Sequence, residues 1–387
     1  MSLSFAHKRE RVIAVADIAS DSAGACIALV RDDAPASIIC AERSSLTYDE
    51  KSPEQAITSI LSLLEDASAK VMRIYSKLPN ADKRPISSVH AIIHTPLVTS
   101  QTERADTSFK TEELITHNVI GNLARTALTG QKDLDKARLF EAGVASIELN
   151  GYRTGRPVGR RAHNVSVAAL ISQCEPELRA KIVDTLRKGF GVQNPVLHSD
   201  TRAILLGTHA NSIRTNIHFT IDVSGYSTNC VVIHKDAAAE HLVVPEGVRT
   251  ILKRIAGKGL AEEKLSLMKM VSRDSCTTTA CEELNATLAR VEPELVKIFG
   301  EAFSKLISER RMPNDLVLIV APDFAPWMSN FFSRIDFGQF TVTARQFSVH
   351  ALTPEAMRDS VSGNLGPKVD AWLSLGTALA SADEKST

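Results

Sequence analysis

The chain has 387 residues, of which 44% are hydrophobic and 23% are charged; this is ordinary for a soluble globular protein and long enough for two or more domains. Lysine plus arginine and aspartate plus glutamate both number 45, so no overall charge attracts the chain to nucleic acid or acidic lipid. The sequence shows no signal peptide and no apolar run long enough to cross a membrane, so we expect a cytoplasmic protein.

Six cysteines occur in the chain, and none belongs to a Cys-x-x-Cys motif. They are Cys26, Cys40, Cys174, Cys230, Cys276 and Cys281. Several lie in apolar segments, where a buried and reduced thiol is the expected state.

The N-terminal segment predicts a strand that ends in an acidic residue. Residues 12–18 are apolar up to Asp17, residues 19–24 form a small polar turn, and residues 25–30 form a second apolar strand. A third strand at residues 37–42 completes an antiparallel meander.

A helix is predicted after this meander. Ser52 is a suitable N-cap, and Pro53 suits the first helical turn. Apolar residues then follow at helical spacing, and such a stripe usually packs into a core. They are Ile57, Ile60, Leu61, Leu64 and Val71.

The middle of the chain alternates strands and helices around one polar stretch. The predicted elements are a strand at residues 88–94, a polar stretch at 99–107, a helix at 111–128, strands at 139–149 and 164–170, and a helix at 175–189. Between the last two strands, four arginines lie close together in the sequence: Arg153, Arg156, Arg160 and Arg161. This loop is either a solvated loop or a patch that binds a protein or an anionic surface. Nucleic acid is disfavoured as a partner, because no aromatic residues alternate along the loop to stack bases.

Residues 216–235 predict a hairpin that repeats the N-terminal pattern. Apolar residues alternate along its first strand, which ends at Asp222 and Val223, and a turn of small residues runs from Ser224 to Thr228. A carboxylate beside small residues, backbone N–H groups and hydroxyls can hold a phosphate and its magnesium ion. Since Asp17 begins the same kind of turn, we expect two related lobes that face one cleft.

The rest of the chain predicts a second series of elements. They are a strand and a helix over residues 242–256, a helix from residue 260, helices over 281–310, a strand at 316–320 and a helix at 371–380. Residues 382–387 follow that last helix directly, so we expect no C-terminal amphipathic helix that would anchor the chain to a membrane.

The two strand-Asp-turn-strand units resemble the phosphate loops of the actin/Hsp70 ATPase superfamily. Within it, the chain is most similar to the FtsA-like bacterial cell-division proteins. Residues 145–159 resemble the stretch of that family in which a strand leads through a loop to Pro-x-Gly, and Gly376 matches the small hinge residue of its second connecting helix. The resemblance implies an α/β, actin-like ATPase fold with two lobes around a cleft and an inserted 1C (SHS2-like) subdomain.

The same resemblance implies the domain bounds. The first lobe (1A) would comprise residues 11–86, 166–215 and 361–382, the 1C subdomain residues 87–165, and the second lobe (2A/2B) residues 216–360.

The resemblance also implies ATP and Mg²⁺ as cofactors, with Asp17 and Asp222 holding the metal through its bound water. The implied cofactor-binding residues are Asp17, Ser20, Ser22, Asp222, Ser224, Gly225, Ser227 and Thr228. Asp17 and Asp222 could instead be turn residues that cap their own backbones. Glu262 and Lys264 resemble an acid and a lysine that approach the adenosine in the family; the other interpretation is that both are exposed helix charges.

The implied nucleotide loops nevertheless lack most of the glycines of the family. Ala19 replaces a glycine of the first loop, Ser224 and Tyr226 replace two glycines of the second, and Asn229 replaces its last aspartate. Residues 321–323, Ala-Pro-Asp, stand in place of the glycine-rich adenosine loop. Glycine allows positive φ and close approach of a phosphate, whereas tyrosine adds bulk and proline removes an N–H donor. We therefore expect at most a weak ATPase and a non-catalytic protein.

The resulting hypothesis is a cytoplasmic, FtsA-like actin-fold scaffold of bacterial cell division. It would self-associate and bind a tubulin-like division protein, and a partner would recruit it to the inner face of the cell membrane. The alternative is a PilM-like platform of type IV pilus or secretion machinery that binds a peptide of an inner-membrane partner. A third interpretation is a phosphotransferase on the same fold.

Overall fold

The computed structural model describes residues 10–46, 53–79, 84–130, 135–210, 217–234, 237–272, 279–307, 311–363, 366 and 368–386. The chain divides into two compact units. The first comprises Met1–His94, Glu177–Ser212 and Leu352–Thr387, and the second comprises Thr95–Pro176 and Ile213–Ala351. Each unit contains one of the two turns that follow an acidic residue.

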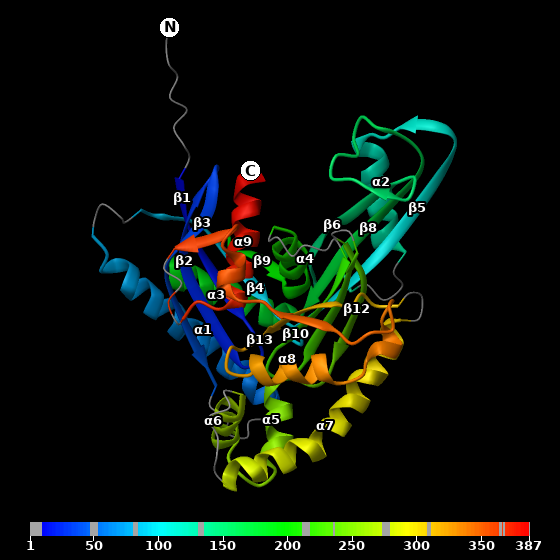
Figure 1. Cartoon of the computed structure of the whole chain (residues 1–387). Helices are drawn as coiled ribbons and strands as arrows, with labels where there is room; N and C mark the ends of the chain where they lie inside the picture. Colours follow the sequence, from blue (N-terminus) through cyan, green and yellow to red (C-terminus); the bar gives the residue numbers. More distant parts are fainter. Residues whose placement is uncertain are drawn as a thin grey trace. The chain divides into compact units, whose positions relative to one another are not determined.

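The first unit is built on a six-stranded sheet in the order β15-β3-β2-β1-β4-β9 (Figure 1). Its strands are β1 (Glu10–Ile18), β2 (Ser22–Arg31), β3 (Ala34–Ser45), β4 (Ile86–Ile93), β9 (Val196–Ser199) and β15 (Val361–Gly363). The first three strands form the predicted antiparallel meander, and the other three pair in parallel with their neighbours. β1 is almost completely buried, as expected of a central strand with both faces covered.

Helices cover both faces of this sheet. The Cys40 thiol lies 3.8 Å from the Val71 carbonyl oxygen of α1 (Pro53–Ser76), and Cys40 pairs with Ile27 of β2. Cys26, the neighbour of Ile27, instead contacts Thr377 of α9 (Ala371–Ser386). Since successive strand residues point to opposite faces, α1 and α9 lie on opposite sides of the sheet (Figure 1). The described residues of this unit also form α3 (Pro176–Phe190), α4 (Asp200–Ala210) and a short 3-10 helix (Pro354–Met357).

The predicted apolar stripe of α1 packs against the sheet. Ile60, Leu64 and Val71 are buried and Leu61 is half-buried, which confirms this helix face as core. The predicted N-cap Ser52 lies outside the described residues, as does the side chain of Ile57.

α9 continues to Ser386, although the sequence predicted that it ends at residue 380. The extension reads Ser-Ala-Asp-Glu-Lys-Ser, of which Ala, Glu and Lys favour a helix, and its two acidic side chains contact buried histidines. Gly376 lies where α9 crosses the sheet, and a Cβ there would be 2.9 Å from Ile92 and 3.0 Å from Val15. The close approach of α9 to β1 and β4 therefore requires glycine at this position.

The second unit contains a five-stranded sheet with a matching strand order, β12-β11-β10-β13-β14. Its strands are β10 (Ile217–Val223), β11 (Thr228–His234), β12 (Ala237–Val244), β13 (Asp315–Val320) and β14 (Ser348–Ala351). Again three strands form an antiparallel meander and two continue in parallel beyond its first strand. The predicted relationship between the two acid-containing turns therefore extends to five strands of each sheet.

Helices and phenylalanine side chains form the core beside this second sheet. The helices are α5 (Val248–Ala256), α6 (Ala261–Ser272), α7 (Thr279–Leu306) and α8 (Ala325–Arg334). Where the sequence predicted helices over residues 281–310, α7 is one helix with Pro293 inside it. Phe303 of α7 is fully buried, and its ring lies 5.3 Å from that of Phe219 on β10.

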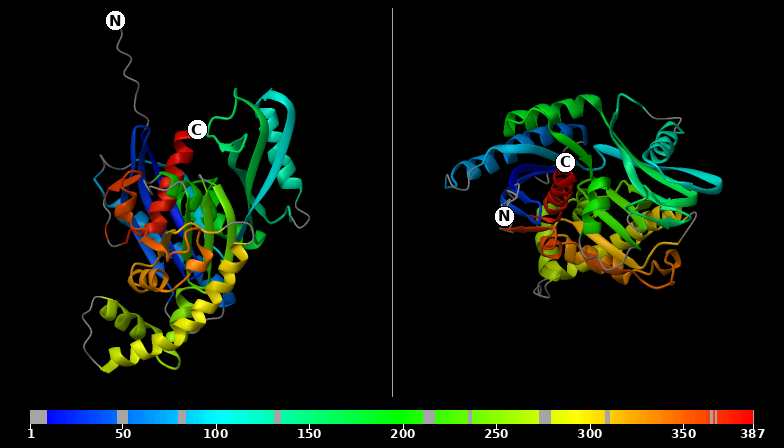
Figure 2. Two further views of the ribbon diagram at one scale, coloured as in Figure 1. Left: turned by 45° about the vertical axis from the view of Figure 1, so that its right-hand side comes forward. Right: turned by 90° about the horizontal axis from the view of Figure 1, so that it is seen from above.

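A four-stranded sheet in the order β5-β8-β6-β7 belongs to the second unit (Figure 2). It comprises β5 (Val98–Leu114), β6 (Leu139–Leu149), β7 (Tyr152–Arg153) and β8 (Arg161–Cys174), and α2 (His117–Thr129) packs against it. Residues 99–107, which the sequence predicted only as a polar stretch, form part of β5. The predicted start of the helix is wrong, because the helix begins at His117 rather than at residue 111.

The physical reason is that β5 is an edge strand. It pairs with β8 only, and most of its side chains are exposed or half-exposed, so it lacks the apolar alternation that marks a buried strand. Its backbone pairs with β8 from Val98 to Ser108 and, after an irregularity, again at Glu113 and Leu114, and this pairing fixes a strand that the side-chain pattern does not predict.

The predicted domain bounds stay predictions. β4 ends at Ile93, and β8 runs without interruption through the predicted boundary at residue 165 as far as Cys174.

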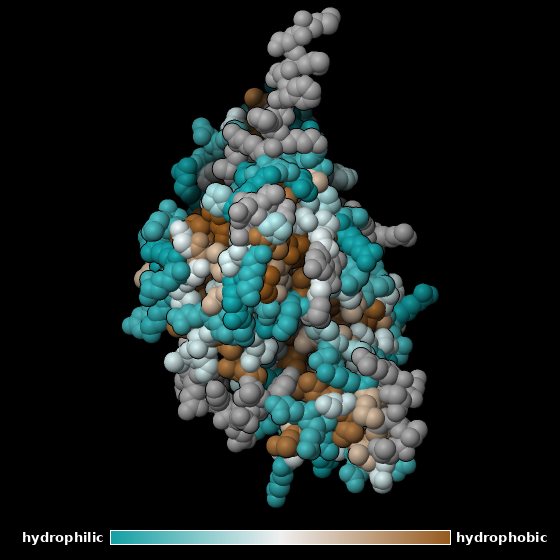
Figure 3. Space-filling model, turned by 90° about the vertical axis from the view of Figure 1, so that its left-hand side faces the viewer, coloured by the Kyte–Doolittle hydropathy of each residue, from teal (hydrophilic) through white to brown (hydrophobic). Residues whose placement is uncertain are grey.

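Four cysteines are free and buried, as predicted: Cys26, Cys40, Cys174 and Cys230. None of the helices in the described part of the chain is both long enough and apolar enough to cross a membrane. On the face shown in Figure 3, hydrophobic residues form several small patches separated by hydrophilic residues.

Candidate functional site

The first acid-containing turn is shorter than predicted. β1 ends at Ile18 and β2 begins at Ser22, so the turn consists of residues 19–21 rather than 19–24. The Ala19 N–H donates to the Ser22 carbonyl at 2.9 Å and closes the turn. Asp17 lies one residue before the end of β1 and is completely buried.

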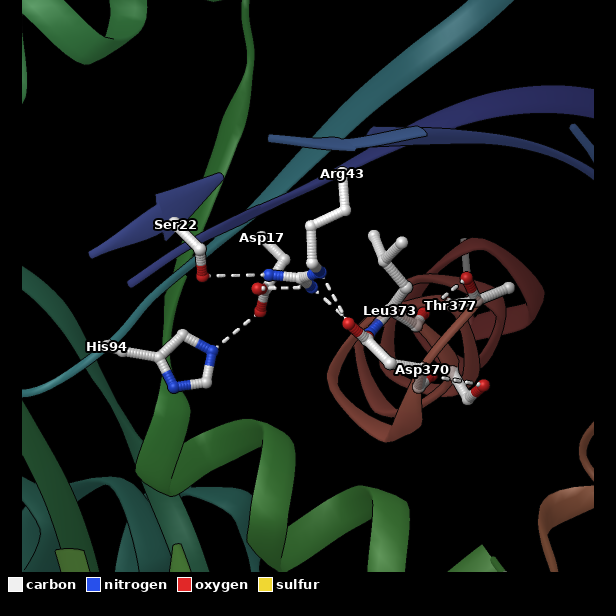
Figure 4. Close-up of polar contacts among 8 residues, drawn as sticks. Asp17, Ser22, Arg43, His94, Asp370, Leu373 and Thr377 are labelled. Atoms are coloured by element: carbon white, nitrogen blue, oxygen red, sulfur yellow. Dashed lines mark hydrogen bonds and ion pairs between the residues drawn. The ribbon is translucent and has the colours of Figure 1, made fainter. Parts of the chain in front are cut away.

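An arginine that the sequence did not single out reaches this turn (Figure 4). Asp17, Gly24 and Arg43 are direct neighbours across β1, β2 and β3. The Arg43 side chain crosses Gly24, where a Cβ would lie 2.8 Å from Nη2, and places that nitrogen 2.8 Å from Asp17 Oδ2. Nη1 of Arg43 also donates to the Ser22 hydroxyl at 3.1 Å. Glycine at position 24 is what leaves room for the guanidinium beside Asp17.

Two further residues complete the cluster around Asp17. His94 Nε2 lies 2.6 Å from Asp17 Oδ1 and donates to it, because a carboxylate only accepts. Asp370 pairs with the other side of the Arg43 guanidinium, with Oδ1 3.1 Å from Nη2. The same Asp370 oxygen accepts the Leu373 N–H at 3.0 Å and so caps the first turn of α9. The cation of Arg43 is therefore shared by two buried carboxylates of one unit.

The charges of the cluster shift its pKa values. Burial raises the pKa of Asp17, but the charges of His94 and Arg43 outweigh burial and lower it to about 2. Burial favours the neutral form of Arg43, yet Asp370 and Asp17 raise the pKa of the guanidinium, which stays charged. Burial and the neighbouring Asp17 raise the pKa of Asp370 against the opposing effect of Arg43.

The second acid-containing turn is held by its own backbone and by the start of α5. The Ser224 N–H donates to the Ser227 carbonyl at 2.9 Å. The Ser224 and Gly225 carbonyls accept the first N–H groups of α5, those of Val248 at 2.9 Å and Arg249 at 2.8 Å. In other proteins, the N–H groups at the start of a helix can bind an anion. Here these two N–H groups already donate to carbonyls of the turn.

The hydroxyls of this turn also donate within the unit. The Ser224 hydroxyl lies 3.1 Å from the Thr95 carbonyl and 3.0 Å from the Ser227 carbonyl, and the Thr228 hydroxyl donates to the Glu246 carbonyl at 2.6 Å. A hydroxyl has one hydrogen to donate, and phosphate oxygens need donors. Asp222 is buried opposite Asn229, whose side-chain oxygen accepts from His241 at 2.6 Å.

Replacement of Gly247 by alanine should disrupt this second turn. A Cβ at Gly247 would lie 2.4 Å from the Ser224 carbonyl oxygen and 2.6 Å from the Gly225 backbone. These are backbone atoms, so they can shift only if the turn itself is distorted. We expect Gly247→Ala to lower the free energy of unfolding by about 1–3 kcal/mol, measured by urea denaturation. Gly155→Ala is the matched control, because no atom lies within 4 Å of its added Cβ. Equal stability of the two variants would contradict the close packing of Gly247 against the backbone of Ser224 and Gly225.

These contacts test whether the two turns suit a magnesium–nucleotide complex. At the first turn, both carboxylate oxygens of Asp17 already accept from donor groups, Oδ2 from the Arg43 guanidinium and Oδ1 from His94. At the second turn, the donors of Ser224 and Thr228 are committed to carbonyls. The buried Ser20 hydroxyl, by contrast, has no hydrogen-bond partner among the described residues. The assignment of these residues to ATP and Mg²⁺ stays a prediction, but the donor set at Asp17 does not fit a metal.

The other sequence-predicted residues lie on the surface. Glu262 is exposed and Lys264 half-buried on α6. Asp323, in the predicted adenosine loop, forms an ion pair with Lys269 of α6 at 2.7 Å. Arg156 and Arg160 are exposed in the loop before β8, and Arg161 is exposed at the start of that strand; the side chain of Arg153 lies outside the described residues.

Sequence reasoning missed Arg43, His94 and Asp370. Arg43 is 26 residues from Asp17 and 327 from Asp370, so no local motif joins them. The one available signal was the meander itself, because its register places Arg43 beside Gly24 and Asp17.

Comparison with known proteins identifies the fold. No protein-family model and no curated protein matches the sequence. Among solved structures, the chain is similar to one described as a PilM-PilN type IV pilus biogenesis complex, with a TM-score of 0.56 and 13% identity over 95% of this chain and 98% of that chain. It is also similar to the ethanolamine utilization protein EutJ from Carboxydothermus hydrogenoformans, with a TM-score of 0.45 and 11% identity over 96% and 90% of the two chains. An Aquifex aeolicus PPX-GPPA enzyme gives a TM-score of 0.37 and 12% identity over 96% and 91%.

The first of these similarities shows that the chain has the predicted α/β, actin-like ATPase fold. The other two TM-scores are too low to carry an argument. None of the three structures is described as a cell-division protein.

Proposed function

We propose that the protein is an actin-fold scaffold that binds protein partners and does not turn over nucleotide. The observation that carries the proposal is the ion pair of Arg43 with Asp17 at 2.8 Å. In an ATPase of this fold, the acid of the first turn would need to face a hydrated metal; here the chain supplies its own cation to that acid. The hydroxyls committed to carbonyls in the second turn support the same proposal.

A PilM-like platform of pilus or secretion machinery is the favoured form of this scaffold. The support is the similarity over almost the full length of both chains to a structure described as a pilus biogenesis complex. An FtsA-like role in cell division, which we expected from the sequence, has no such support. In either form, the sheet of β5, β8, β6 and β7 with α2 would correspond to the 1C subdomain, and the exposed Arg156, Arg160 and Arg161 would belong to a partner surface.

Calorimetry with ATP and Mg²⁺ tests the absence of a working nucleotide site. We expect no saturable heat from wild-type protein at millimolar ATP and no phosphate release above background. Micromolar binding that Asp222→Ala abolishes, together with turnover on the order of one per second, would overturn the proposal.

In vivo photo-crosslinking distinguishes the two scaffold roles. Crosslinks from the loop of residues 154–160 to an inner-membrane pilus or secretion protein would support the platform, and crosslinks to a tubulin-like protein would support the division role instead. The matched variant reverses the charge of Arg156, Arg160 and Arg161 to glutamate. It should lose the crosslinks while keeping the fold, because these side chains are exposed.

A further inference from the structure

A second buried polar cluster lies in the first unit, away from Asp17. His90 on β4 and His198 on β9 are buried, and His90 Nδ1 lies 3.4 Å from His198 Nε2. The last turn of α9 supplies two acids to this pair. Glu384 Oε1 is 3.2 Å from His90 Nε2, and Asp383 Oδ2 is 3.3 Å from His198 Nε2.

Two arginines and a serine also contact the two acids. Arg11 of β1 lies 3.5 Å from Glu384, and Arg202 of α4 lies 3.9 Å from Asp383. The Ser88 hydroxyl of β4 donates to Glu384 at 2.6 Å. Arg11 also pairs with the exposed Asp32 at 2.9 Å, so three acids and two arginines are linked around the two histidines.

The geometry describes a hydrogen bond rather than a metal site. The ring centroids lie 5.7 Å apart and the ring planes differ by 7°, so the two rings meet end to end through their nitrogens. Two histidines that bind one metal ion would instead aim their lone pairs at a common point beside the line between the nitrogens.

The hydrogen-bond partners determine where the protons are. Glu384 only accepts, so His90 Nε2 carries a hydrogen, and neutral His90 accepts at Nδ1. Asp383 also only accepts, so His198 Nε2 carries a hydrogen, which faces both Asp383 Oδ2 at 3.3 Å and His90 Nδ1 at 3.4 Å. Protonation of His90 would place a hydrogen on both facing nitrogens and break this bond.

We propose that the His90–His198 pair is a pH-sensitive lock that holds the last turn of α9 on β4 and β9 at neutral pH and releases it in mild acid. The lock is independent of any nucleotide or partner. Burial lowers the pKa of His90 below its ordinary value of 6.5, which agrees with a neutral locked state. Because the folded pKa is lowered, the stabilisation is present above pH 6.5 and is lost as the pH falls below it.

Hydrogen exchange measured by mass spectrometry tests this proposal on the full chain. After correction for the intrinsic pH dependence of exchange, we expect the α9 peptide that contains Asp383 and Glu384 to open up to about tenfold more at about pH 5.5 than at about pH 7.5. Tenfold is the largest increase expected if one proton binds His90 in the released state, with the ordinary pKa of 6.5, and does not bind it in the locked state. The opening should rise as the pH falls through 6.5, above the range in which carboxylates titrate.

His90→Gln is the decisive variant, because the glutamine amide can still donate to Glu384 and accept from His198 but does not titrate. It should abolish the pH response. His163→Gln is the matched control, because His163 is exposed on β8 in the other unit, and this variant should respond as wild type does.

The proposal would be overturned if wild-type protein showed no pH response, or a response with its midpoint in the range where carboxylates titrate. A full pH response in His90→Gln would overturn it as well. If His90→Gln does not fold, His198→Gln decides the question. It can still donate to His90 and leaves that residue titratable, so it should keep the response.

Discussion

Replacing Arg43 by methionine is expected to destabilise the first unit by about 3–5 kcal/mol, because two buried carboxylates lose the cation that they share. Asp17 is completely buried and Asp370 is 7% exposed, so water cannot replace the guanidinium. Methionine keeps much of the apolar length of the side chain and removes the charge. Urea denaturation of the full chain, monitored through the fluorescence of Trp372, whose ring centroid lies 5.5 Å from Arg43 Cζ, measures the loss.

The matched control is Arg31→Met. Arg31 pairs with Glu10 across β1 and β2 at 2.8 Å, a distance equal to that between Arg43 and Asp17, but its side chain is 39% exposed. We expect this surface pair to contribute about 0–1 kcal/mol. Asp17→Asn combined with Arg43→Met should be less destabilised than Arg43→Met alone, because one uncompensated charge is gone. Equal losses at Arg31 and Arg43 would contradict the buried ion-pair cluster.

The pH dependence of the Arg43→Met variant has a definite sign. In the wild type, the pKa of Asp17 is lowered from 3.8 to about 2, so its contribution to stability is present above pH 3.8 and is lost as the pH falls toward 2. Without Arg43, burial raises the pKa values of both acids. The stability deficit of the variant should therefore be largest at neutral pH and should shrink as the pH falls.

Replacement of Phe303 by alanine is expected to cost the second unit about 3–5 kcal/mol, because it leaves a cavity in the middle of an aromatic cluster. Phe303 is fully buried, and its ring centroid lies 5.1–6.4 Å from six other phenylalanine rings. They are Phe219, Phe299, Phe332, Phe337, Phe340 and Phe347. Phe219 lies on β10, three residues before Asp222, so the cavity also removes support from the strand that ends at the second turn.

Tyr152→Ala is the control for this prediction. Tyr152 is 74% exposed in the same unit, so its truncation should change the stability by no more than about 0.5 kcal/mol. The midpoint of urea denaturation gives both values. A Phe303→Ala variant as stable as Tyr152→Ala would mean that the aromatic cluster does not hold the unit together.

Local pattern was sufficient to predict the elements that carry the two turns. β1 and β10 are central strands, and their apolar runs followed by an acid and small residues are visible without any tertiary information. Local pattern was not sufficient for β5, because an exposed edge strand is held in place by backbone pairing with β8, a strand that is distant in the sequence.

Part of the candidate site was likewise predictable from local pattern, and part was not. The positions of Asp17 and Asp222 were predictable, whereas the groups that decide the chemistry of Asp17 come from β3, from the end of β4 and from the start of α9. The contacts of His90 and His198 with the final turn of α9 could not be predicted from the sequence either, since three segments separated by about a hundred residues or more meet there. Long-range ion pairs leave no periodic signal in a sequence.

The position of Asp370 has a consequence for the order in which the chain folds during synthesis. The first unit begins at the N-terminus, yet α9, the Asp370 partner of Arg43 and the acids that contact His90 and His198 all lie after residue 351. The second unit is complete once residue 351 has left the ribosome. Domains usually fold in the order of synthesis, N-terminal first. For this chain we expect the reverse order, because β1 to β4 lack β15 and α9 until the residues after 351 have emerged.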